Sequence, residues 1–340
     1  MPQQKFFLWL VPALIAELLW AQPVLGASSF SERPEVHQFV IAMADKHGFD
    51  ADELTSLFAH VKPRPSVART MTQRVTKPAP WEHYRANCVN AWNIRHGVNF
   101  WNANAAALVR ARQIYGVPEE VIVAIIGVET RYGKLRLPYP ALDTLATLAF
   151  DYPRRADFFR GELEQYLLLM REEGRNPRAV RGSYAGAMGI PQFMPSSYRS
   201  YAVDFDGDGR RDLWHNASDS IGSVANYLKA YGWNADQPVA MRAYLQQEAP
   251  AYSDSWGSDG LEPVRSLEAL EALGIAPARQ LPPETPVALH TVEMNGEQEL
   301  WLGLNNFYVI TRYNHSLYYA LAVYQLGNEI RQARMEATER

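Results

Sequence analysis

The sequence predicts a mainly α-helical protein with a small antiparallel β region, that is, an α+β fold. Helix start and stop signals recur along most of the chain, from about residue 34 to residue 231. Nearer the C-terminus, two apolar stretches flank Asn295 and Gly296, a strong signal for a two-residue β-hairpin turn. The chain has 340 residues, of which 47% are hydrophobic and 21% charged, so it can bury a sizeable core and form two or three domains.

The first 26 residues have the pattern of a secretory signal peptide. A short basic start precedes a mostly apolar run from Phe6 to Trp20, and small residues around Gly26 form a cleavage-site exit. Glu17 interrupts the apolar run and leaves it short for a membrane span. We therefore expect residues 1–26 to be a signal peptide; an uncleaved leader would instead hold the chain at a membrane. No cysteine lies near the exit, so a lipid-anchored form is not expected.

Residues 27–80 predict an N-terminal helical segment. Pro34 suits a first helical turn, apolar residues follow it at helical spacing, and Gly48 provides a stop signal. Asp50 is the expected cap of a second, short helix. Two Pro-rich connectors follow, and the second, residues 77–80, marks the expected boundary of the next domain.

Residues 81–236 form the expected core domain, in which helix signals dominate. Residues 121–128 are apolar or Gly without interruption, so their helix is expected to be buried on all faces. Pro118 is expected to start this helix, and Gly133 offers a left-handed C-cap. Further helices are predicted at residues 99–115, 142–150, 156–173 and 218–231.

The composition changes after residue 236, where Pro and Gly become frequent. Residues 237–311 are expected to form a small β-containing domain. Its strands are predicted at residues 286–293, 298–303 and 307–311. The last segment, residues 312–340, is expected to carry a C-terminal helix from about residue 316 to residue 335.

The helix that contains residues 121–128 ends in a carboxylate, Glu129. This residue shares a helical stripe with Ile122, Ile125 and Ile126, so its side chain is expected in an apolar environment. A carboxylate there is costly to ionise unless a cation pairs with it, and otherwise its pKa is raised. The helix alone favours a structural ion pair with Arg131 or another Arg, and a catalytic acid is the alternative that the rest of the chain has to support.

An acidic loop begins about 75 residues later. It matches the calcium loop of an EF-hand, with carboxylates at positions 1, 3, 5 and 9 from Asp204, Asp206, Asp208 and Asp212. Gly209 takes position 6, and Arg210 offers its backbone carbonyl at position 7. Position 12 is His215, a poor calcium ligand, and the next acid, Asp219, could close the site only in a longer loop. A solvated acidic turn is the alternative, but mutual repulsion of so many acids favours a bound ion.

Two further stretches offer polar groups to a substrate. Residues 182–198 are rich in Gly and contain Ser183 and Gln192, neutral hydrogen-bonding groups that suit a polyol or amide substrate. A Gly-packed helix junction is the alternative there. Tyr313 and Asn314 precede the last helix, where a simple N-cap is the alternative.

Charge and cysteine content exclude several classes of protein. The formal net charge of -4 gives no electrostatic case for nucleic-acid binding. Cys88 is the only cysteine, so an intrachain disulfide and a Cys-based metal cluster are both excluded. We expect Cys88 to be a buried small hydrophobe.

Seven stretches recur in a fixed order in one family. They are GVETRYG (127–133), YPRRA (152–156), GSYAGAMG (182–189), PQFMPSSY (191–198), DFDGDG (204–209), IGSVANYL (221–228) and RYNHS (312–316). Together they resemble the membrane-bound lytic murein transglycosylase B family of proteobacterial cell-wall enzymes. The resemblance runs from about residue 30 to the end of the chain.

The resemblance implies a lysozyme-like helical core with an N-terminal helical domain and a small antiparallel β domain. It implies that Glu129 is the sole catalytic acid/base and that Asp219 supplies the last ligand of a structural calcium site. No organic cofactor is expected. The family's substrate-groove positions fall on Tyr84, Ser183, Gln192, Tyr227, Tyr313 and Asn314.

The implied activity is cleavage of the β-1,4 bond between N-acetylmuramic acid (MurNAc) and N-acetylglucosamine (GlcNAc) in peptidoglycan, with formation of a 1,6-anhydromuramic acid end. A lysozyme-type muramidase and a non-catalytic, calcium-stabilised wall-binding protein are the alternatives. Because an ion pair would lower the pKa of Glu129 and spoil its role as an acid, we expect Arg131 to point away from it. The implied setting is the periplasm, where a monomer acts on glycan strands, with cell-wall synthesis or division proteins as candidate partners.

Overall fold

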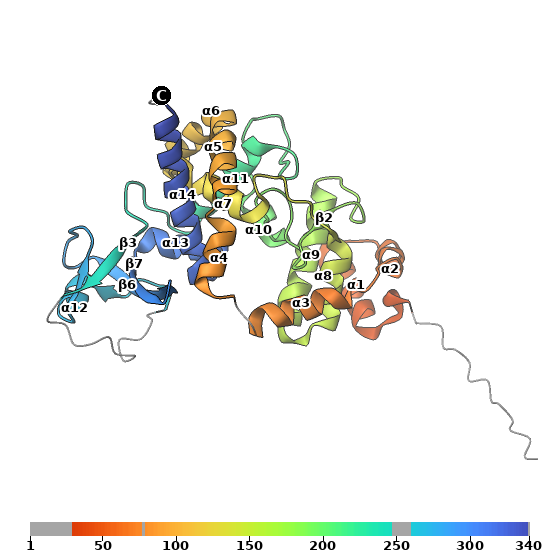
Figure 1. The fold of residues 1–340 in the computed structure, drawn as a ribbon. Helices are drawn as coiled ribbons and strands as arrows, with labels where there is room; N and C mark the ends of the chain where they lie inside the picture. Colours follow the sequence, from red (N-terminus) through yellow and green to blue (C-terminus); the bar gives the residue numbers. More distant parts are fainter. Residues whose placement is uncertain (1–28, 77–78, 247–259, 339–340) are drawn as a thin grey trace, which may run out of the picture. The chain divides into compact units, whose positions relative to one another are not determined.

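The computed structural model describes residues 29–76, 79–246 and 260–338 (Figure 1). The described part of the chain divides into two compact units, one ending at His60 and the other beginning at Val61. The predicted signal peptide, residues 1–26, lies outside the described residues. Within the described residues, no helix combines the length and the apolar character that a membrane span requires.

The first unit is helical, as the sequence predicts. A 3-10 turn, η1 (Phe30–Glu32), precedes α1 (Pro34–His47) and α2 (Ala51–Ala59). Gly48 ends α1 in the left-handed conformation, with φ of 64°. The Asp50 carboxylate accepts hydrogen bonds from the backbone N–H groups of Asp52 and Glu53 and so caps α2. The two helices pack through their apolar faces, where the rings of Phe39 and Phe58 meet edge to face.

The second unit is built around α7 (Glu119–Thr130), whose residues 121–127 are all buried. Helices α14 (Leu317–Thr338), α5 (Ala91–Ala103), α6 (Ala105–Tyr115) and α11 (Ala217–Ala230) pack around it (Figure 1). The prediction of a helix buried on all faces is therefore confirmed. The remaining helices among the described residues are α3 (Pro65–Thr76), α4 (Trp81–Cys88), α8 (Ala141–Asp151), α9 (Ala156–Glu172), α10 (Pro195–Tyr201), α12 (Leu267–Glu271) and α13 (Asn305–Tyr313), with a 3-10 turn η2 (Pro153–Arg155).

The sequence placed some of these helices wrongly. The single helix predicted at residues 99–115 is two helices, α5 and α6, which meet at Asn104. Helices α3 and α4 were not predicted, because Pro and polar residues at their starts favour extended connectors as well as helix starts. Helix α4 packs through Trp81, whose side chain is buried against the ring of Tyr318. Packing at this position stabilises a short helix that its own sequence specifies weakly.

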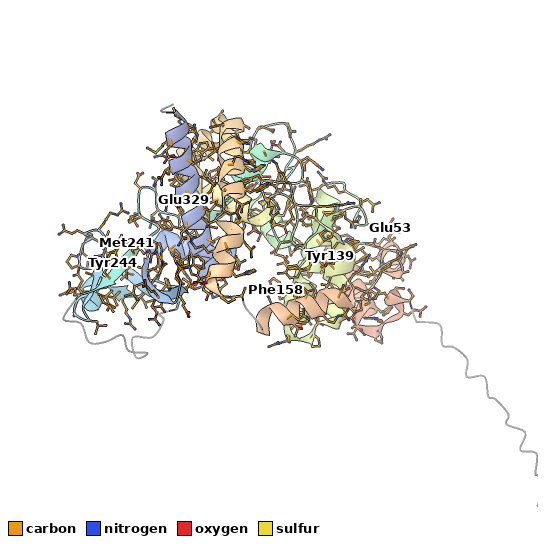
Figure 2. The ribbon with its side chains drawn as sticks, viewed as in Figure 1. Glu53, Tyr139, Phe158, Met241, Tyr244 and Glu329 are labelled. Carbon is orange, nitrogen blue, oxygen red and sulfur yellow. The ribbon has the colours of Figure 1, made fainter. Side chains whose placement is uncertain are left out.

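A five-stranded antiparallel sheet forms the β region, in the order β4-β6-β7-β3-β5. Its strands are β3 (Ala240–Leu245), β4 (Arg265–Ser266), β5 (Ile275–Pro277), β6 (Pro286–Met294) and β7 (Glu297–Gly303). Asn295 and Gly296, at φ of 55° and 78°, make the predicted hairpin turn between β6 and β7. One face of the sheet buries Met241 beside α12, whereas Tyr244 of the same strand is exposed (Figure 2).

The third strand predicted at residues 307–311 is wrong, since these residues lie in helix α13. A short apolar run with β-branched residues fits either period, so tertiary contacts decide its conformation. Asn306 supplies these contacts, because its side chain donates to the backbone oxygens of Asn234 and Gln237 and accepts from the N–H of Asn234. These hydrogen bonds fix the first turn of α13 against the segment after α11.

A two-stranded sheet holds the Gly-rich stretch that the sequence singles out. Strand β1 (Tyr139–Pro140) pairs with β2 (Arg181–Gly182), and Met188 bridges to both Gly182 and Phe193. Gly189 has φ of 73°, and a Cβ there would lie 2.6 Å from the Leu213 carbonyl oxygen. Only Gly fits this close backbone approach, which sets the Gly-rich stretch against the segment before α11.

Candidate active site

Glu129 lies in the last turn of α7 and is half-buried. The hydroxyl of Tyr319, a buried residue of α14, donates a hydrogen bond to Glu129 Oε1 over 2.8 Å. Burial raises the pKa of Glu129 from its ordinary value of 4.5 to about 7, and the hydrogen bond from Tyr319 opposes the rise. A carboxyl group with this pKa is protonated in a substantial fraction of molecules near neutral pH, as a general acid must be.

Arg131 does not neutralise Glu129. Its side chain is exposed, and its guanidinium carbon lies 5.6 Å from the centre of the Trp92 ring. Among the described residues, Glu129 makes no salt bridge. The expectation that Arg131 points away from Glu129 is confirmed, and the structural ion pair is not formed.

The end of α7 differs from the prediction and explains where Arg131 points. Arg131, not Gly133, is the C-cap, and Arg131, Tyr132 and Gly133 all have positive φ, of 49°, 62° and 76°. Tyr132 is held in this strained turn because its hydroxyl donates to the Asn93 carbonyl oxygen over 2.7 Å. Its ring also packs on Gly127, where a Cβ would lie 2.6 Å from the Tyr132 hydroxyl oxygen.

Aromatic side chains from four parts of the chain gather beside Glu129. The rings of Tyr313 and Tyr319 stack with centroids 6.3 Å apart, and Tyr227 meets Tyr313 at 4.9 Å. Phe193 packs on both Tyr227 and Tyr313, at 5.6 and 5.8 Å. Burial, and then the charge of Glu129, raise the pKa of Tyr313 well above its ordinary value, so its hydroxyl stays protonated as a donor.

The hydroxyl groups of this cluster also fix neighbouring backbone. Tyr313 donates to the Pro191 carbonyl oxygen and Tyr227 to the Arg312 carbonyl oxygen, each over 2.6 Å. Tyr313 therefore joins α13 to the Gly-rich stretch. The structure brings the predicted residues Tyr227 and Tyr313 into direct contact.

Ser183 and Gln192 both lie in the Gly-rich stretch, which is attached to the end of α7. Thr130 donates to the Ile190 carbonyl oxygen over 2.7 Å. The Ser183 hydroxyl oxygen accepts from the N–H groups of Ala185 and Ala187, which leaves its own hydrogen to donate. Gln192 has φ of 53°, and its amide N–H donates to the Gly189 carbonyl oxygen over 2.9 Å.

Tyr84 and Asn314 complete the predicted groove residues. Tyr84, on α4, has its ring 6.1 Å from that of Tyr318, and its charge contributes to the raised pKa of Tyr319. Asn314 is the exposed C-cap of α13, and its side chain has no hydrogen-bond partner among the described residues. The structure thus places Tyr84 near the Glu129–Tyr319 pair, and Asn314 next to Tyr313 in the chain.

Sequence reasoning missed Tyr319, the one side-chain hydrogen-bond partner of Glu129 in the described structure. Its position on the buried face of α14 marks it as a core residue, and a buried Tyr hydroxyl needs an acceptor. The sequence does not identify that acceptor, which lies 190 residues earlier. Cys88 also lies in this region and is half-buried, less than the buried small hydrophobe that the sequence predicts. Burial and the charge of Glu129 raise its pKa to about 11, so its thiol stays protonated.

The acidic loop brings three carboxylates together as a metal site would. Oxygen atoms of Asp204, Asp206 and Asp219 lie within 4.8 Å of one another. Asp219, in the first turn of α11, is buried, and its two oxygens accept from the N–H groups of Phe205 and Asp212, each over 2.8 Å. Burial raises the pKa of Asp219, and the charge of Asp206 adds to the rise. A hard divalent cation would offset this repulsion, and the all-oxygen donor set fits calcium.

The other predicted ligands, Asp208 and Arg210, lie outside the group of three carboxylates. Asp208 Oδ1 accepts from the N–H of Arg210 over 2.8 Å. Asp208 and the carbonyl of Arg210 remain predicted ligands. Asp212 instead faces Arg175 and His215, at 3.5 and 3.2 Å.

We expect the Glu129→Gln variant to gain stability relative to the wild type as pH rises. Because the folded-state pKa of Glu129, about 7, exceeds the ordinary value of 4.5, the folded protein retains this proton after the unfolded chain has lost it. The wild-type free energy of unfolding therefore loses roughly 3 kcal/mol between pH 4.5 and 7 from this group, and the variant does not.

Urea unfolding at pH 4.5 and pH 8 measures this difference. The exposed Glu329, on the surface of α14 (Figure 2), supplies the control Glu329→Gln, which should follow the wild type at both pH values. If the free energy of unfolding changed by the same amount between the two pH values in the wild type and in Glu129→Gln, the raised pKa would be contradicted.

Comparison with known proteins shows which family this chain resembles over most of its length. The family model described as a transglycosylase SLT domain matches residues 31–328. Membrane-bound lytic murein transglycosylase B of Escherichia coli (strain K12) is 45% identical over 316 residues, which cover 90% of this chain and 85% of that protein.

Solved structures agree with this. The Escherichia coli lytic transglycosylase Slt35 in complex with calcium is 46% identical, with a TM-score of 0.82 over 90% of this chain and 95% of that one. SltB3 of Pseudomonas aeruginosa in complex with NAG-NAM-pentapeptide is 30% identical, with a TM-score of 0.75 over 90% of this chain and 80% of that one. The expected mainly α fold with a lysozyme-like core is confirmed.

Proposed function

The chain belongs to the family of membrane-bound lytic murein transglycosylase B, and on this basis we propose that it is a lytic transglycosylase that cleaves the MurNAc–GlcNAc bonds of peptidoglycan. The observation that carries the proposal is the environment of Glu129, a half-buried carboxyl group with a pKa of about 7. Such a group can donate a proton and then accept one at neutral pH.

Glu129 acts alone in this mechanism. Most glycoside hydrolases need a second carboxylate as base or nucleophile. Asp143, one candidate for that role, is instead paired with Arg64 at 2.9 Å. The only side chain hydrogen-bonded to Glu129 in the described structure is the neutral Tyr319. This arrangement favours a transglycosylase over a hydrolase.

In the first step, protonated Glu129 donates to the glycosidic oxygen. The bond between this oxygen and C1 of MurNAc breaks, and the GlcNAc hydroxyl leaves. Positive charge develops at C1 as an oxocarbenium or, with help from the substrate's acetamido group, an oxazolinium species. The aromatic cluster and the neutral donors Ser183 and Gln192 orient the sugar without adding charge.

In the second step, ionised Glu129 accepts the proton of the C6 hydroxyl of the same MurNAc. The freed oxygen forms the bond to C1 and closes the 1,6-anhydro ring, so no water is consumed. The hydrogen bond from Tyr319 stabilises the ionised form of Glu129 between the two steps. Tyr319 acts through Glu129 and is therefore a positioning residue.

Removal of the acid should abolish cleavage. We expect Glu129→Gln to lose turnover of purified sacculi while its Tm at pH 5 stays at or above that of the wild type, because the amide keeps the shape and cannot deliver a proton. Wild-type products should carry anhydromuramic ends by mass spectrometry. Products heavier by one water would identify a muramidase, and substantial turnover by the variant would exclude Glu129 as the acid.

Removal of the Tyr319 hydroxyl should change the pH profile. In Tyr319→Phe the pKa of Glu129 rises further, because the hydrogen bond that favours its ionised form is lost. The fall of kcat/KM at high pH should therefore move to higher pH, with kcat reduced by the slower second step. Tyr324→Phe, elsewhere on α14, is the matched control. An unshifted profile with reduced kcat would assign Tyr319 a purely structural role.

We also propose that the acidic loop holds a structural calcium ion. Asp204, Asp206 and Asp219 would be ligands, and the related Slt35 has been solved in complex with calcium. Asp208 and the Arg210 carbonyl are proposed as further ligands on the strength of the EF-hand spacing. The ion would fix the start of α11, the helix that carries Tyr227.

Chelation should therefore lower the Tm. An ion bound only by the folded state adds about 2.7 kcal/mol when its free concentration is 100 times its Kd. Asp206→Asn should weaken this stabilisation, whereas Asp236→Asn, outside the loop, should keep it. An unchanged Tm in chelator, with no calcium found by elemental analysis, would exclude the site.

Export to the periplasm fits the proposed substrate. The signal pattern of residues 1–26 supports it, and an uncleaved leader would tether the enzyme to the membrane, as the name of the Escherichia coli relative suggests for that protein. The proposed partners are peptidoglycan glycan strands, with cell-wall synthesis or division proteins as candidates to recruit the enzyme.

A further inference from the structure

A cationic pocket of about 460 Å³ lies beside the Gly-rich stretch. Three arginines line it, Arg136 from the segment after α7, Arg175 from the end of α9 and Arg181 from β2. His215 and Trp214 close the pocket from the segment before α11. The lining contains no acidic residue, although the whole chain has a net charge of -4.

The positive charge of this pocket is only partly compensated. Arg175 faces Asp212 at 3.5 Å, and the same carboxylate also faces His215. Arg181 donates to the carbonyl oxygens of Leu137 and Pro138, which are neutral. Arg136 is exposed and has no ion-pair or hydrogen-bond partner in the described part of the chain. An anion that entered the pocket would therefore meet uncompensated guanidinium groups.

In a second cavity, by contrast, the charge of the arginines is compensated by carboxylates. It lies at the start of α7, has a volume of about 440 Å³ and is also lined by arginines. Its lining includes the carboxylates of Glu120 and Asp236. Arg331 lies 3.8 Å from Glu120, and Arg112 pairs at 3.4 Å with Glu119, which lies next to the lining residue Glu120 in the chain. These carboxylates neutralise the cavity, so it offers an anion much less than the pocket lined by Arg136.

Trp214 holds one of the arginines of this pocket in place. Its indole N–H is buried and has no hydrogen-bond partner among the described residues. The guanidinium carbon of Arg175 lies 4.3 Å from the centre of its ring, so stacking holds this arginine in place. Because this N–H is enclosed by protein atoms, the contribution of Trp214 to the pocket is the ring on which Arg175 stacks.

The cationic pocket is connected to the Gly-rich stretch through β2 and through Leu213. Arg181 lies two residues before Ser183, and its strand β2 is hydrogen-bonded to β1. The Leu213 carbonyl oxygen, directly before Trp214, accepts from the N–H of Ile190 over 2.7 Å. A substituent on a sugar bound along residues 183–192 would therefore lie close to this pocket.

We propose that this pocket binds a carboxylate of the peptide stem that peptidoglycan carries on MurNAc. The assignment rests on the proposed function for the identity of the ligand, and on the arginine cluster for its charge. Guanidinium groups pair with carboxylates in a bidentate geometry, and a stem offers several carboxylates close to the cleaved bond. The pocket would then favour glycan that bears peptides over bare glycan.

Calorimetric titration of the wild-type chain with the free pentapeptide of NAG-NAM-pentapeptide tests the proposal without any turnover. We expect binding, and we expect Arg136→Gln to raise Kd by about tenfold, because a hydrogen bond between charged groups contributes about 1.5 kcal/mol or more. Arg136→Glu should raise Kd further. Arg95→Gln, an exposed arginine of α5 outside the pocket, should leave Kd unchanged.

Two further probes identify the recognised group. The same peptide with its carboxylates converted to amides should not bind, and inorganic phosphate should bind more weakly than the acidic peptide. Phosphate binding that depends on Arg136, without pentapeptide binding, would overturn the assignment to peptide stems in favour of a phosphate site. Absence of pentapeptide binding, or equal Kd values in the wild type and both Arg136 variants, would overturn the proposal.

The outcome is independent of the proposed activity. If the wild type binds pentapeptide through Arg136 but never cleaves sacculi, the pocket stands and the transglycosylase proposal fails. If it forms anhydromuramic ends but does not bind the peptide, the activity stands and the pocket assignment fails.

Discussion

The burial of one carboxylic acid at the end of an apolar helix is the constraint on which the rest of the site depends. Glu129 can serve as an acid near neutral pH only while water and cations are kept away from most of its surface. The packing of α14 against α7 achieves this and at the same time brings the Tyr319 hydroxyl to Glu129 Oε1. Hydrophobic packing and electrostatic tuning therefore come from the same pair of helices.

The turn after α7 protects this arrangement from the nearest cation. A conventional Gly C-cap at residue 131 would give no particular direction to a side chain there. Instead Arg131 itself takes the left-handed conformation, and its guanidinium lies near Trp92. The strain is maintained by the hydrogen bond of Tyr132 to Asn93 and by the absence of a side chain at Gly127. A local backbone cost thus preserves the proton affinity of Glu129.

Charged side chains are distributed unevenly around Glu129 and its groove. The groove proposed beside Glu129 contains uncharged Tyr, Ser and Gln side chains, which we propose bind the sugar. One hydroxyl, that of Tyr319, favours the ionised form of the acid. Carboxylates are concentrated at the acidic loop, where they fix the start of α11. Uncompensated arginines are concentrated beyond the Gly-rich stretch, in the pocket of Arg136. Separation of these groups allows a single chain to carry an acid and, as proposed, to hold a cation and an anionic stem.

The sequence by itself determined what local physics controls. Gly48 and Asp50 fixed helix ends, Asn295 and Gly296 fixed the hairpin, and the unbroken apolar run before Glu129 fixed the burial of α7. The choice between an ion pair and a raised pKa at Glu129 was left to the fold. Motif order was enough to name the family and the groove residues, although their roles remain predictions.

Tertiary structure decided what depends on contacts between distant residues. Residues 307–311 fit a strand or a helix equally well until Asn306 bound the segment after α11. Tyr319 was one buried aromatic among several until packing placed it on Glu129. Arg136, Arg175 and Arg181 are separate surface charges in the sequence and form one pocket only in the fold. The physical reason is that periodicity and capping act over a few residues, whereas pairing of a hydroxyl, an amide or a guanidinium depends on which elements pack together.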